Sequence, residues 1–313
     1  SYSNAICAGL LDLHPKSNNQ RKGMMANMML NNEDTTTNFS LLALSGKDGR
    51  RFLQGQLSCD MDQLQDGQIL PGALCNLKGR VVASMRVWQC NDVIYLCAGQ
   101  GMADIIANTL NKYMVFFDCQ LSIVTEQYQL WRMADAASSD AAKALATNTI
   151  LNDGSNFAVC LDKTDRLGTR YELFVAGESN ASALMAQLPD TLEPASPEHW
   201  AVASTESAWV MIRPEISEKY TPQLLNYDLN GTVNFKKGCY TGQEVIARMY
   251  YRAEAKQRLY RLQRPSNSEV SDFGINKADN IVFTAEDGER VVQLVIASTD
   301  DTRRHPDIET ITN

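Results

Sequence analysis

The residue types best suited to chemistry gather in the stretch KKGCYTGQEVIAR, residues 236–248. Cys239 lies two residues before Thr241, and the spacing of Thr241 and Glu244 is typical of a capping box at a helix start. Apolar residues follow at helical spacing, so a helix is predicted from about residue 242. The positive end of that helix and the two preceding lysines would favour the thiolate, the nucleophilic form of cysteine. The alternative is that Cys239 is a small side chain filling a tight turn.

Positive charge accumulates around the same stretch, although the net charge of the chain is −8. Two acidic residues, Glu244 and Glu254, oppose eight basic residues here: Lys236, Lys237, Arg248, Arg252, Lys256, Arg258, Arg261 and Arg264. A polyanionic ligand could bind such a patch, and a solvated face is the alternative. The acidic total argues against a protein whose entire surface binds nucleic acid.

Other chemical signatures are absent from the sequence. His14, His199 and His305 stand apart, and no zinc-type Cys/His cluster, calcium loop or phosphate-binding loop occurs, so no metal site is predicted. Eight cysteines without a C-x-x-C pair indicate a reducing compartment, and we expect the cytoplasm. No apolar run of membrane-spanning length and no signal peptide are recognised.

The spacing of apolar side chains predicts the elements that would hold these residues. Alternation over 79–98, with a turn at Asn91–Asp92, predicts a β-hairpin, and further hairpins are predicted around Asp153–Gly154 and Asp287–Gly288. Strands are also predicted at 39–46, 121–134, 171–177 and 258–264. Helices are also predicted from about Asp48 to Gly55 and at 102–114, 141–146 and 181–188. Residues 189–198 are predicted to be a connection.

The predicted strands and helices form two similar successions along the chain, and neither follows a strict βαβα order. This indicates an α+β fold with antiparallel sheets. A chain of 313 residues is long enough for several domains. The predicted divisions are a mobile N-terminal arm at 1–37, a first α+β domain at 38–120, a second at 121–254 that includes the cysteine motif, and a small β unit at 255–313.

At this point the motifs resemble a known family. KGCYTGQE, residues 237–244, matches the K-G-C-Y-x-G-Q-E motif of the YgfZ proteins, folate-binding relatives of the glycine-cleavage T-protein, an aminomethyltransferase. FLQGQLSCDM (52–61) resembles the family's LQGQ segment, and TPQLLN (221–226) resembles its Pro-Gln-x-x-Asn. The order and spacing agree, so the resemblance covers about residues 38–313. It implies a three-domain T-protein-like ring, with two ferredoxin-like α+β domains that interleave in sequence and a small C-terminal β-barrel.

The resemblance also implies the site. The family depends on the motif cysteine, here Cys239, and the supporting residues would be Lys237, Gly238, Tyr240, Gly242, Gln243, Glu244 and Arg252. The implied cofactor is tetrahydrofolate or a derivative, contacted by Phe39 (often Trp in the family), Trp200 and Glu206. Aromatic rings stack on a pterin, and a carboxylate accepts both N–H groups of its aminopyrimidinone edge. Taken alone, Trp200 would be read as domain-junction packing and Glu206 as a surface charge.

The function implied is a folate-binding accessory protein that supports iron–sulfur cluster enzymes and tRNA methylthiolation. Its partners would be folate and iron–sulfur enzymes or assembly factors, with tRNA contacted indirectly and no membrane involved. The alternative is a T-protein-type aminomethyltransferase. Those enzymes carry an Asp-Asp pair where this chain has Ala83 and Ser84, and proton transfer at the folate nitrogen needs a carboxylate within reach. A third hypothesis is direct tRNA binding by the basic stretch 236–264.

Overall fold

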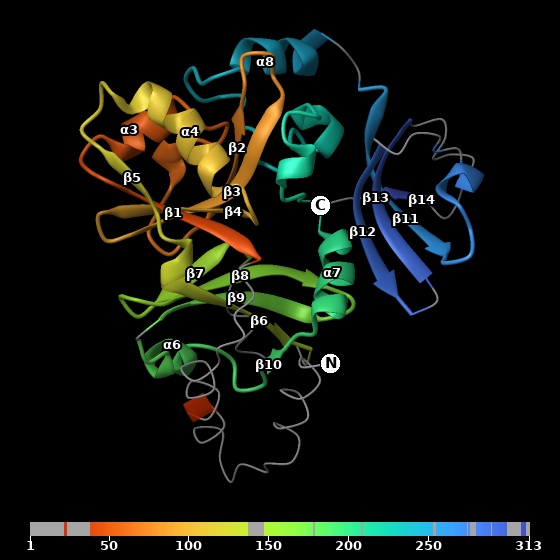
Figure 1. The fold of residues 1–313 in the computed structure, drawn as a ribbon, viewed down its shortest axis with the longest axis horizontal. Coiled ribbons are helices and arrows are strands. Elements are labelled where there is room, and N and C mark those ends of the chain that lie inside the picture. Colours follow the sequence, from red (N-terminus) through yellow and green to blue (C-terminus); the bar gives the residue numbers. More distant parts are fainter. Residues whose placement is uncertain are drawn as a thin grey trace. The chain divides into compact units, whose positions relative to one another are not determined.

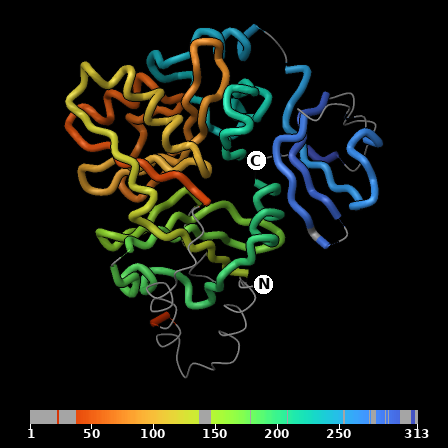
Figure 2. Tube along the Cα trace, in the orientation of Figure 1, coloured from red at the N-terminus to blue at the C-terminus, as the bar shows by residue number. Residues whose placement is uncertain are grey.

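The computed structural model describes residues 22–23, 38–136, 147–177, 179–207, 209–252, 255–273, 275, 280–288, 290–298 and 308–310 (Figures 1 and 2). The predicted arm at 1–37, apart from residues 22–23, and the predicted helix at 141–146 lie outside them.

The strands in these residues are β1 (Phe39–Ser45), β2 (Leu70–Cys75), β3 (Val81–Cys90), β4 (Val93–Gly99), β5 (Gln120–Ile123), β6 (Tyr128–Asp135), β7 (Thr149–Asn152), β8 (Phe157–Thr164), β9 (Gly168–Ala176), β10 (Glu193–Pro194), β11 (Gln257–Pro265), β12 (Ile281–Asp287), β13 (Arg290–Ser298) and β14 (Ile308–Thr310). The α-helices are α3 (Gly49–Gln54), α4 (Ala103–Met114), α6 (Ser182–Ala186), α7 (Pro197–Glu206) and α8 (Gln243–Arg252). The 3-10 turns are η1 (Met61–Gln63), η2 (Thr125–Gln127), η3 (Pro214–Ile216), η4 (Pro222–Leu225) and η5 (Val270–Phe273).

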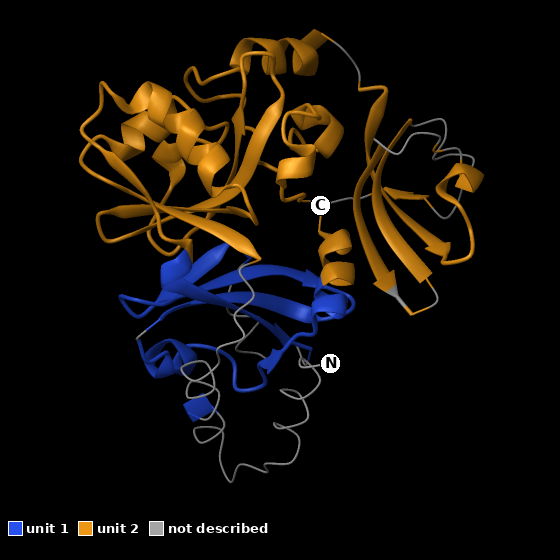
Figure 3. Ribbon diagram, viewed as in Figure 1, with its two compact units in different colours: residues 1–37, 126–200 blue, residues 38–125, 201–313 orange. Residues whose placement is uncertain are grey.

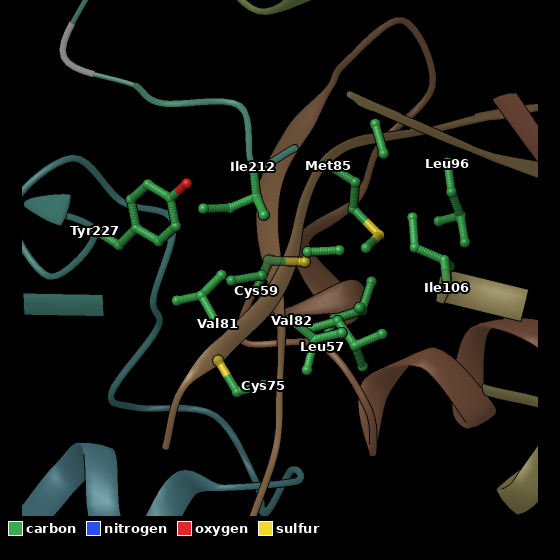
Figure 4. Packing of buried hydrophobic residues seen from close by; sticks show 14 of the residues in the cluster. Leu57, Cys59, Cys75, Val81, Val82, Met85, Leu96, Ile106, Ile212 and Tyr227 are labelled. Atoms are coloured by element: carbon green, nitrogen blue, oxygen red, sulfur yellow. The ribbon is translucent and has the colours of Figure 1, made fainter. Parts of the chain in front are cut away.

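The first sheet is antiparallel, with strand order β2-β3-β4-β1-β5. The predicted hairpin of β3 and β4 is confirmed: Cys90 pairs with Val93 across the two-residue turn, and Asn91 has the positive φ of 53° that tight hairpin turns require. The buried residues of α4 recur every fourth position at Ile106, Leu110 and Met114, so one helix face packs into the core of this sheet. Figure 4 shows Ile106 close to Leu96 and Met85 in that core.

The second sheet, in the order β10-β6-β9-β8-β7, has its own core with α6. The predicted hairpin around Asp153–Gly154 is confirmed, with Gly154 at a φ of +97° between β7 and β8. The third sheet, in the order β12-β13-β11-β14, contains the predicted hairpin at Asp287–Gly288. The structure thus confirms the mixed α+β class with antiparallel sheets.

The single strand predicted over 121–134 is wrong. The segment forms two strands in different sheets, β5 and β6, separated by η2. The reason is the buried Thr125, whose hydroxyl accepts a hydrogen bond from the Leu41 N–H (2.9 Å) and bonds the Leu41 carbonyl (3.3 Å). A side chain that bonds backbone groups in this way replaces a ladder and ends the strand.

The chain divides into two compact units, each built from separate stretches of sequence (Figure 3). Unit 1 comprises residues 1–37 and 126–200, and unit 2 comprises residues 38–125 and 201–313. The domain boundaries expected from the sequence stay a prediction. No helix among the described residues is both long and apolar enough to cross a membrane.

Candidate functional site

The cysteine motif is built around Lys237, whose side chain is buried. Its ammonium donates to the carbonyls of Gln54 (2.7 Å), Leu57 (2.6 Å) and Cys59 (2.7 Å). Gln54 is the last residue of α3, where helix carbonyls lack intrahelical partners and the dipole is negative. Three donors thus meet three acceptors, which is how a buried charge is tolerated, and burial lowers the pKa of the ammonium. Lys237 therefore fastens the cysteine loop to the segment after α3.

Further hydrogen bonds attach the same loop to the LQGQ segment. Ser58 donates through Oγ to the carbonyl of Thr232 (2.7 Å) and accepts from the N–H of Ala73 (2.8 Å), and the Asn234 N–H donates to the Ser58 carbonyl (2.9 Å). The Thr241 N–H donates to the Gly55 carbonyl (3.3 Å). Two motifs nearly 180 residues apart in sequence are therefore one structural assembly.

Hydrogen bonds within the LQGQ segment, residues 52–61, also hold its shape. The Gln54 amide accepts from the Met61 N–H (2.8 Å) and donates to the Asp60 carboxylate (2.8 Å). That carboxylate caps η1 by accepting from the Asp62 N–H (3.2 Å). Gln54 and Asp60 thus shape the platform on which Lys237 rests.

The third motif, TPQLLN (221–226), lies in the chain just before the cysteine loop. Asn226 ends η4 in the left-handed conformation, with a φ of 58°, which asparagine adopts more readily than most residues. Its side-chain amide donates to the Leu259 carbonyl at 2.9 Å. The asparagine therefore turns the chain and ties that turn to β11.

Cys239 is an exposed free thiol. Of the other described cysteines, Cys59, Cys75, Cys90, Cys97 and Cys160 are buried and Cys119 is partly buried. Burial raises the pKa of Cys59 and of Cys75 to about 12, which makes those thiols poor nucleophiles. The anchored loop thus exposes one cysteine between two buried neighbours in the motif, Lys237 and Tyr240.

The remaining motif residues have distinct tasks. Tyr240 is buried in the core, its ring lies 5.1 Å from the Lys237 ammonium, and burial raises the pKa of its hydroxyl. Gly242 has a φ of +83°, and a Cβ there would lie 2.4 Å from the Asn76 carbonyl oxygen, so only glycine fits. Gly238 has open space around it and no positive φ.

The helix after the cysteine is confirmed as α8, with Gln243 as its first residue, Glu244 exposed in its first turn and Arg252 exposed at its end. The predicted capping box is wrong in its contacts, because the Thr241 N–H bonds Gly55 and the Thr241 hydroxyl bonds the Gln56 side chain (3.3 Å). Tertiary partners have replaced the local ones.

A cavity of about 380 Å³ adjoins this contact. It is lined by Thr241 and Gln56, by the turn between β2 and β3, and by the outer end of α4 with Lys112 and Tyr113. Sequence reasoning missed it, because its walls come from segments far apart in the chain.

The residues predicted to contact folate are placed as follows. Phe39 is buried at the start of β1 in unit 2. Trp200 is buried in α7 at the end of unit 1, with the guanidinium groups of Arg132 and Arg170 5.5 and 5.1 Å from its ring. Glu206 is half-buried at the end of α7 in unit 2. Their joint role in folate binding stays a prediction.

Ala83 and Ser84 lie inside β3 and are fully buried. The Ser84 hydroxyl donates to the Val210 carbonyl (3.0 Å) and accepts from the Ile212 N–H (2.8 Å). At these two positions the chain has a methyl group and an engaged hydroxyl instead of the carboxylates of an aminomethyltransferase. Among the described residues, no group of three or more His, Cys, Asp or Glu side chains is arranged to hold a metal ion.

Comparisons with known proteins extend the motif matches. No protein-family model matches the chain. The tRNA-modifying protein YgfZ of Klebsiella pneumoniae is 27% identical over 278 residues, and that of Escherichia coli O157:H7 is 27% identical over 282 residues, each covering 84% of both chains. The YgfZ protein of Colwellia psychrerythraea is 26% identical over 284 residues.

Among solved structures, the glycine cleavage system aminomethyltransferase T of Bartonella henselae matches with a TM-score of 0.62, at 15% identity, over 84% of this chain and 76% of that one. The chain therefore has a T-protein-like fold. Together with the three motifs, these comparisons confirm that the chain resembles the YgfZ family over most of its length.

Proposed function

We propose that the chain is a cytoplasmic, folate-binding accessory protein that supports iron–sulfur cluster enzymes and, through them, tRNA methylthiolation. Tetrahydrofolate would sit in the central channel of a three-domain ring closed by a small β-barrel, in contact with Phe39, Trp200 and Glu206. The relatives' name, tRNA-modifying protein, and the T-protein-like fold support this proposal.

The observation that carries the proposal is the presentation of Cys239. The buried Lys237 anchors the loop through three hydrogen bonds, while Cys239, two residues later, is an exposed free thiol. Anchoring of this kind costs conformational freedom, so it is expected where a side chain must be held in one place for another molecule.

The test is complementation of a bacterial strain that lacks its YgfZ protein, with methylthiolated tRNA nucleosides measured by mass spectrometry. Cys239→Ala and Cys239→Ser should each abolish the recovery of modification. Cys119→Ala is the matched control, because Cys119 is the other described cysteine that is not fully buried. Full recovery with Cys239→Ala would refute the role of the thiol.

Folate binding is tested separately, by titrating the purified chain with tetrahydrofolate. Trp200→Ala and Glu206→Gln should weaken binding, whereas Cys239→Ala should leave the affinity nearly unchanged. If both Trp200→Ala and Glu206→Gln bound tetrahydrofolate with unchanged affinity, the assigned folate site would be refuted. The proposed role of Cys239 would not be affected by that result.

The alternative function, folate-dependent aminomethyl transfer, is favoured by the T-protein-like fold alone. Ala83 and Ser84 oppose it, because neither can move a proton at a folate nitrogen. Sustained turnover of tetrahydrofolate with an aminomethyl donor would establish the alternative and refute the accessory role.

A further inference from the structure

Three aromatic rings meet near the C-terminal end of α8: Phe235, Tyr250 and Tyr251. Phe235 and Tyr250 stack with ring centroids 3.8 Å apart and an interplanar angle of 18°. Tyr251 stands edge-on to both, at 6.1 Å from Phe235 and 5.0 Å from Tyr250. Tyr251 nevertheless remains 68% exposed and Tyr250 41% exposed. Neighbouring rings therefore hold Tyr251 in place while most of its surface is open to a ligand.

Several basic side chains of the stretch 236–264 are already bonded to acceptors within the chain. Lys237 is buried on three carbonyls, Arg258 is bidentate with Asp228 (2.9 Å on each side), and Arg261 pairs with Glu309 (3.0 Å). Arg264 bonds the Gln293 side chain at 3.1 Å. Four exposed cations remain, for which no acidic partner lies within ion-pair distance among the described residues: Lys236, Arg248, Arg252 and Lys256.

These four cations lie close to the aromatic residues along the chain. Lys236 follows Phe235 directly, Arg252 follows Tyr251, Arg248 precedes Tyr251 by one helical turn on the exposed side of α8, and Lys256 lies just beyond the helix. We call Phe235, Tyr250, Tyr251, Lys236, Arg248, Arg252 and Lys256 the α8 surface. It combines exposed aromatic faces with exposed positive charge on a chain whose net charge is −8.

We propose that the α8 surface binds unpaired nucleotides of an RNA directly, with Tyr251 stacking on a base and the four cations contacting phosphates. Aromatic rings give a base a stacking partner, and Lys and Arg side chains follow the backbone, which is the usual pairing in single-strand recognition. A paired duplex buries its base faces, so the surface should prefer a loop. The inference goes beyond the proposed function and does not depend on folate binding.

The position of the surface connects it to the cysteine motif. Phe235 precedes Cys239 by four residues, and consecutive Cα atoms are 3.8 Å apart, so the two Cα atoms are separated by at most about 15 Å. The α8 surface and the loop that carries the exposed thiol therefore belong to neighbouring segments of the chain. The α8 surface would add a direct RNA contact to the indirect role in the proposed function.

The test uses the full chain and a fluorescein-labelled, unmodified tRNA anticodon stem-loop, with binding followed by anisotropy across a salt series. Tyr251→Ala should weaken binding by about 5-fold to 150-fold, the loss expected for one stacked base, whereas Tyr251→Phe should keep most of the affinity. Arg248→Ala should reduce the slope of log K against log salt by about 0.7, the value for one phosphate contact on a single strand.

Two control variants remove an exposed tyrosine and an exposed cation elsewhere in the chain. Tyr113→Ala removes another exposed tyrosine, 40% exposed on α4, and Lys163→Ala removes an exposed cation on β8 of unit 1. Both should bind the stem-loop as the parent chain does. Thermal unfolding of each variant verifies that it is folded, and unchanged tetrahydrofolate binding by Tyr251→Ala separates this surface from the folate site.

Equal binding by Tyr251→Ala and Tyr113→Ala would overturn the proposal, as would binding of a fully paired RNA duplex as tightly as the stem-loop. If Tyr251→Ala left stem-loop binding unchanged but abolished co-purification of an iron–sulfur enzyme, the α8 surface would be a protein-docking face, and the proposal would also fall.

Discussion

Replacement of Lys237 by methionine tests whether the buried ammonium holds the cysteine loop in place. Methionine keeps much of the length and apolar volume of the lysine stem but has no donor. The carbonyls of Gln54, Leu57 and Cys59 would each lose the hydrogen bond that the ammonium now provides. A buried polar group left without its partner costs about 1–3 kcal/mol.

Three such carbonyls set a gross loss of about 3–9 kcal/mol, but the variant also avoids the desolvation of a buried charge, which offsets several kcal/mol. We therefore expect Lys237→Met to lower the free energy of unfolding by about 3 kcal/mol. Lys237→Arg should lose an intermediate amount, because a planar guanidinium does not reproduce the three directions of an ammonium. Urea unfolding measures both changes.

Lys236→Met is the matched control, since Lys236 is the adjacent lysine and is exposed. It should change the free energy of unfolding by no more than about 0.5 kcal/mol, as surface substitutions usually do. If Lys237→Met were no less stable than Lys236→Met, the three hydrogen bonds would not be holding the assembly, and the account of the cysteine loop given above would be wrong.

Two further predictions follow from the same loop. Gly242→Ala should lower the free energy of unfolding by more than about 1 kcal/mol, because alanine is strained at a φ of +83° and its Cβ would lie 2.4 Å from a carbonyl oxygen, whereas Gly238→Ala, in open space, should be nearly neutral in urea unfolding. Iodoacetamide at pH 8 should alkylate Cys239 well before Cys59 and Cys75, whose thiols stay protonated because burial raises their pKa to about 12. Peptide mapping by mass spectrometry measures the three rates of alkylation. Equal rates for Cys239 and the two buried cysteines would contradict the prediction.

Local turn chemistry explains which parts of the fold could be predicted from the sequence. The hairpin at Asn91–Asp92 depends on one residue with positive φ between two alternating runs, and these features lie within a few residues of each other. The break between β5 and β6 depends instead on Thr125 bonding Leu41, about 80 residues away. No periodicity within 121–134 could reveal that contact, so the two strands were predicted as one.

The candidate site shows the same division. The start of α8 follows from the residues around it, and a capping box was the natural local interpretation of Thr241 and Glu244. The same residues left open whether Cys239 is a reactive thiol or fills a tight turn. The structure gives Thr241 partners at Gly55 and Gln56 instead, which only tertiary packing could supply. The family resemblance had paired the LQGQ and KGCYTGQE segments as motifs, and the structure joins them by hydrogen bonds into one assembly.

The basic stretch 236–264 illustrates why charge counts in sequence do not equal charge available for binding. Eight basic residues predicted a patch, but the Lys237 ammonium is buried on backbone carbonyls, and Arg258 and Arg261 pair with carboxylates. The available charge contracts to residues in and beside α8, where Tyr250 and Tyr251 add stacking surface that the charge pattern alone did not indicate. Stacking on an aromatic ring adds affinity to that of the phosphate contacts, and the base faces are open for it only where the bases are unpaired. The contraction therefore favours an unpaired RNA segment over a duplex as the ligand.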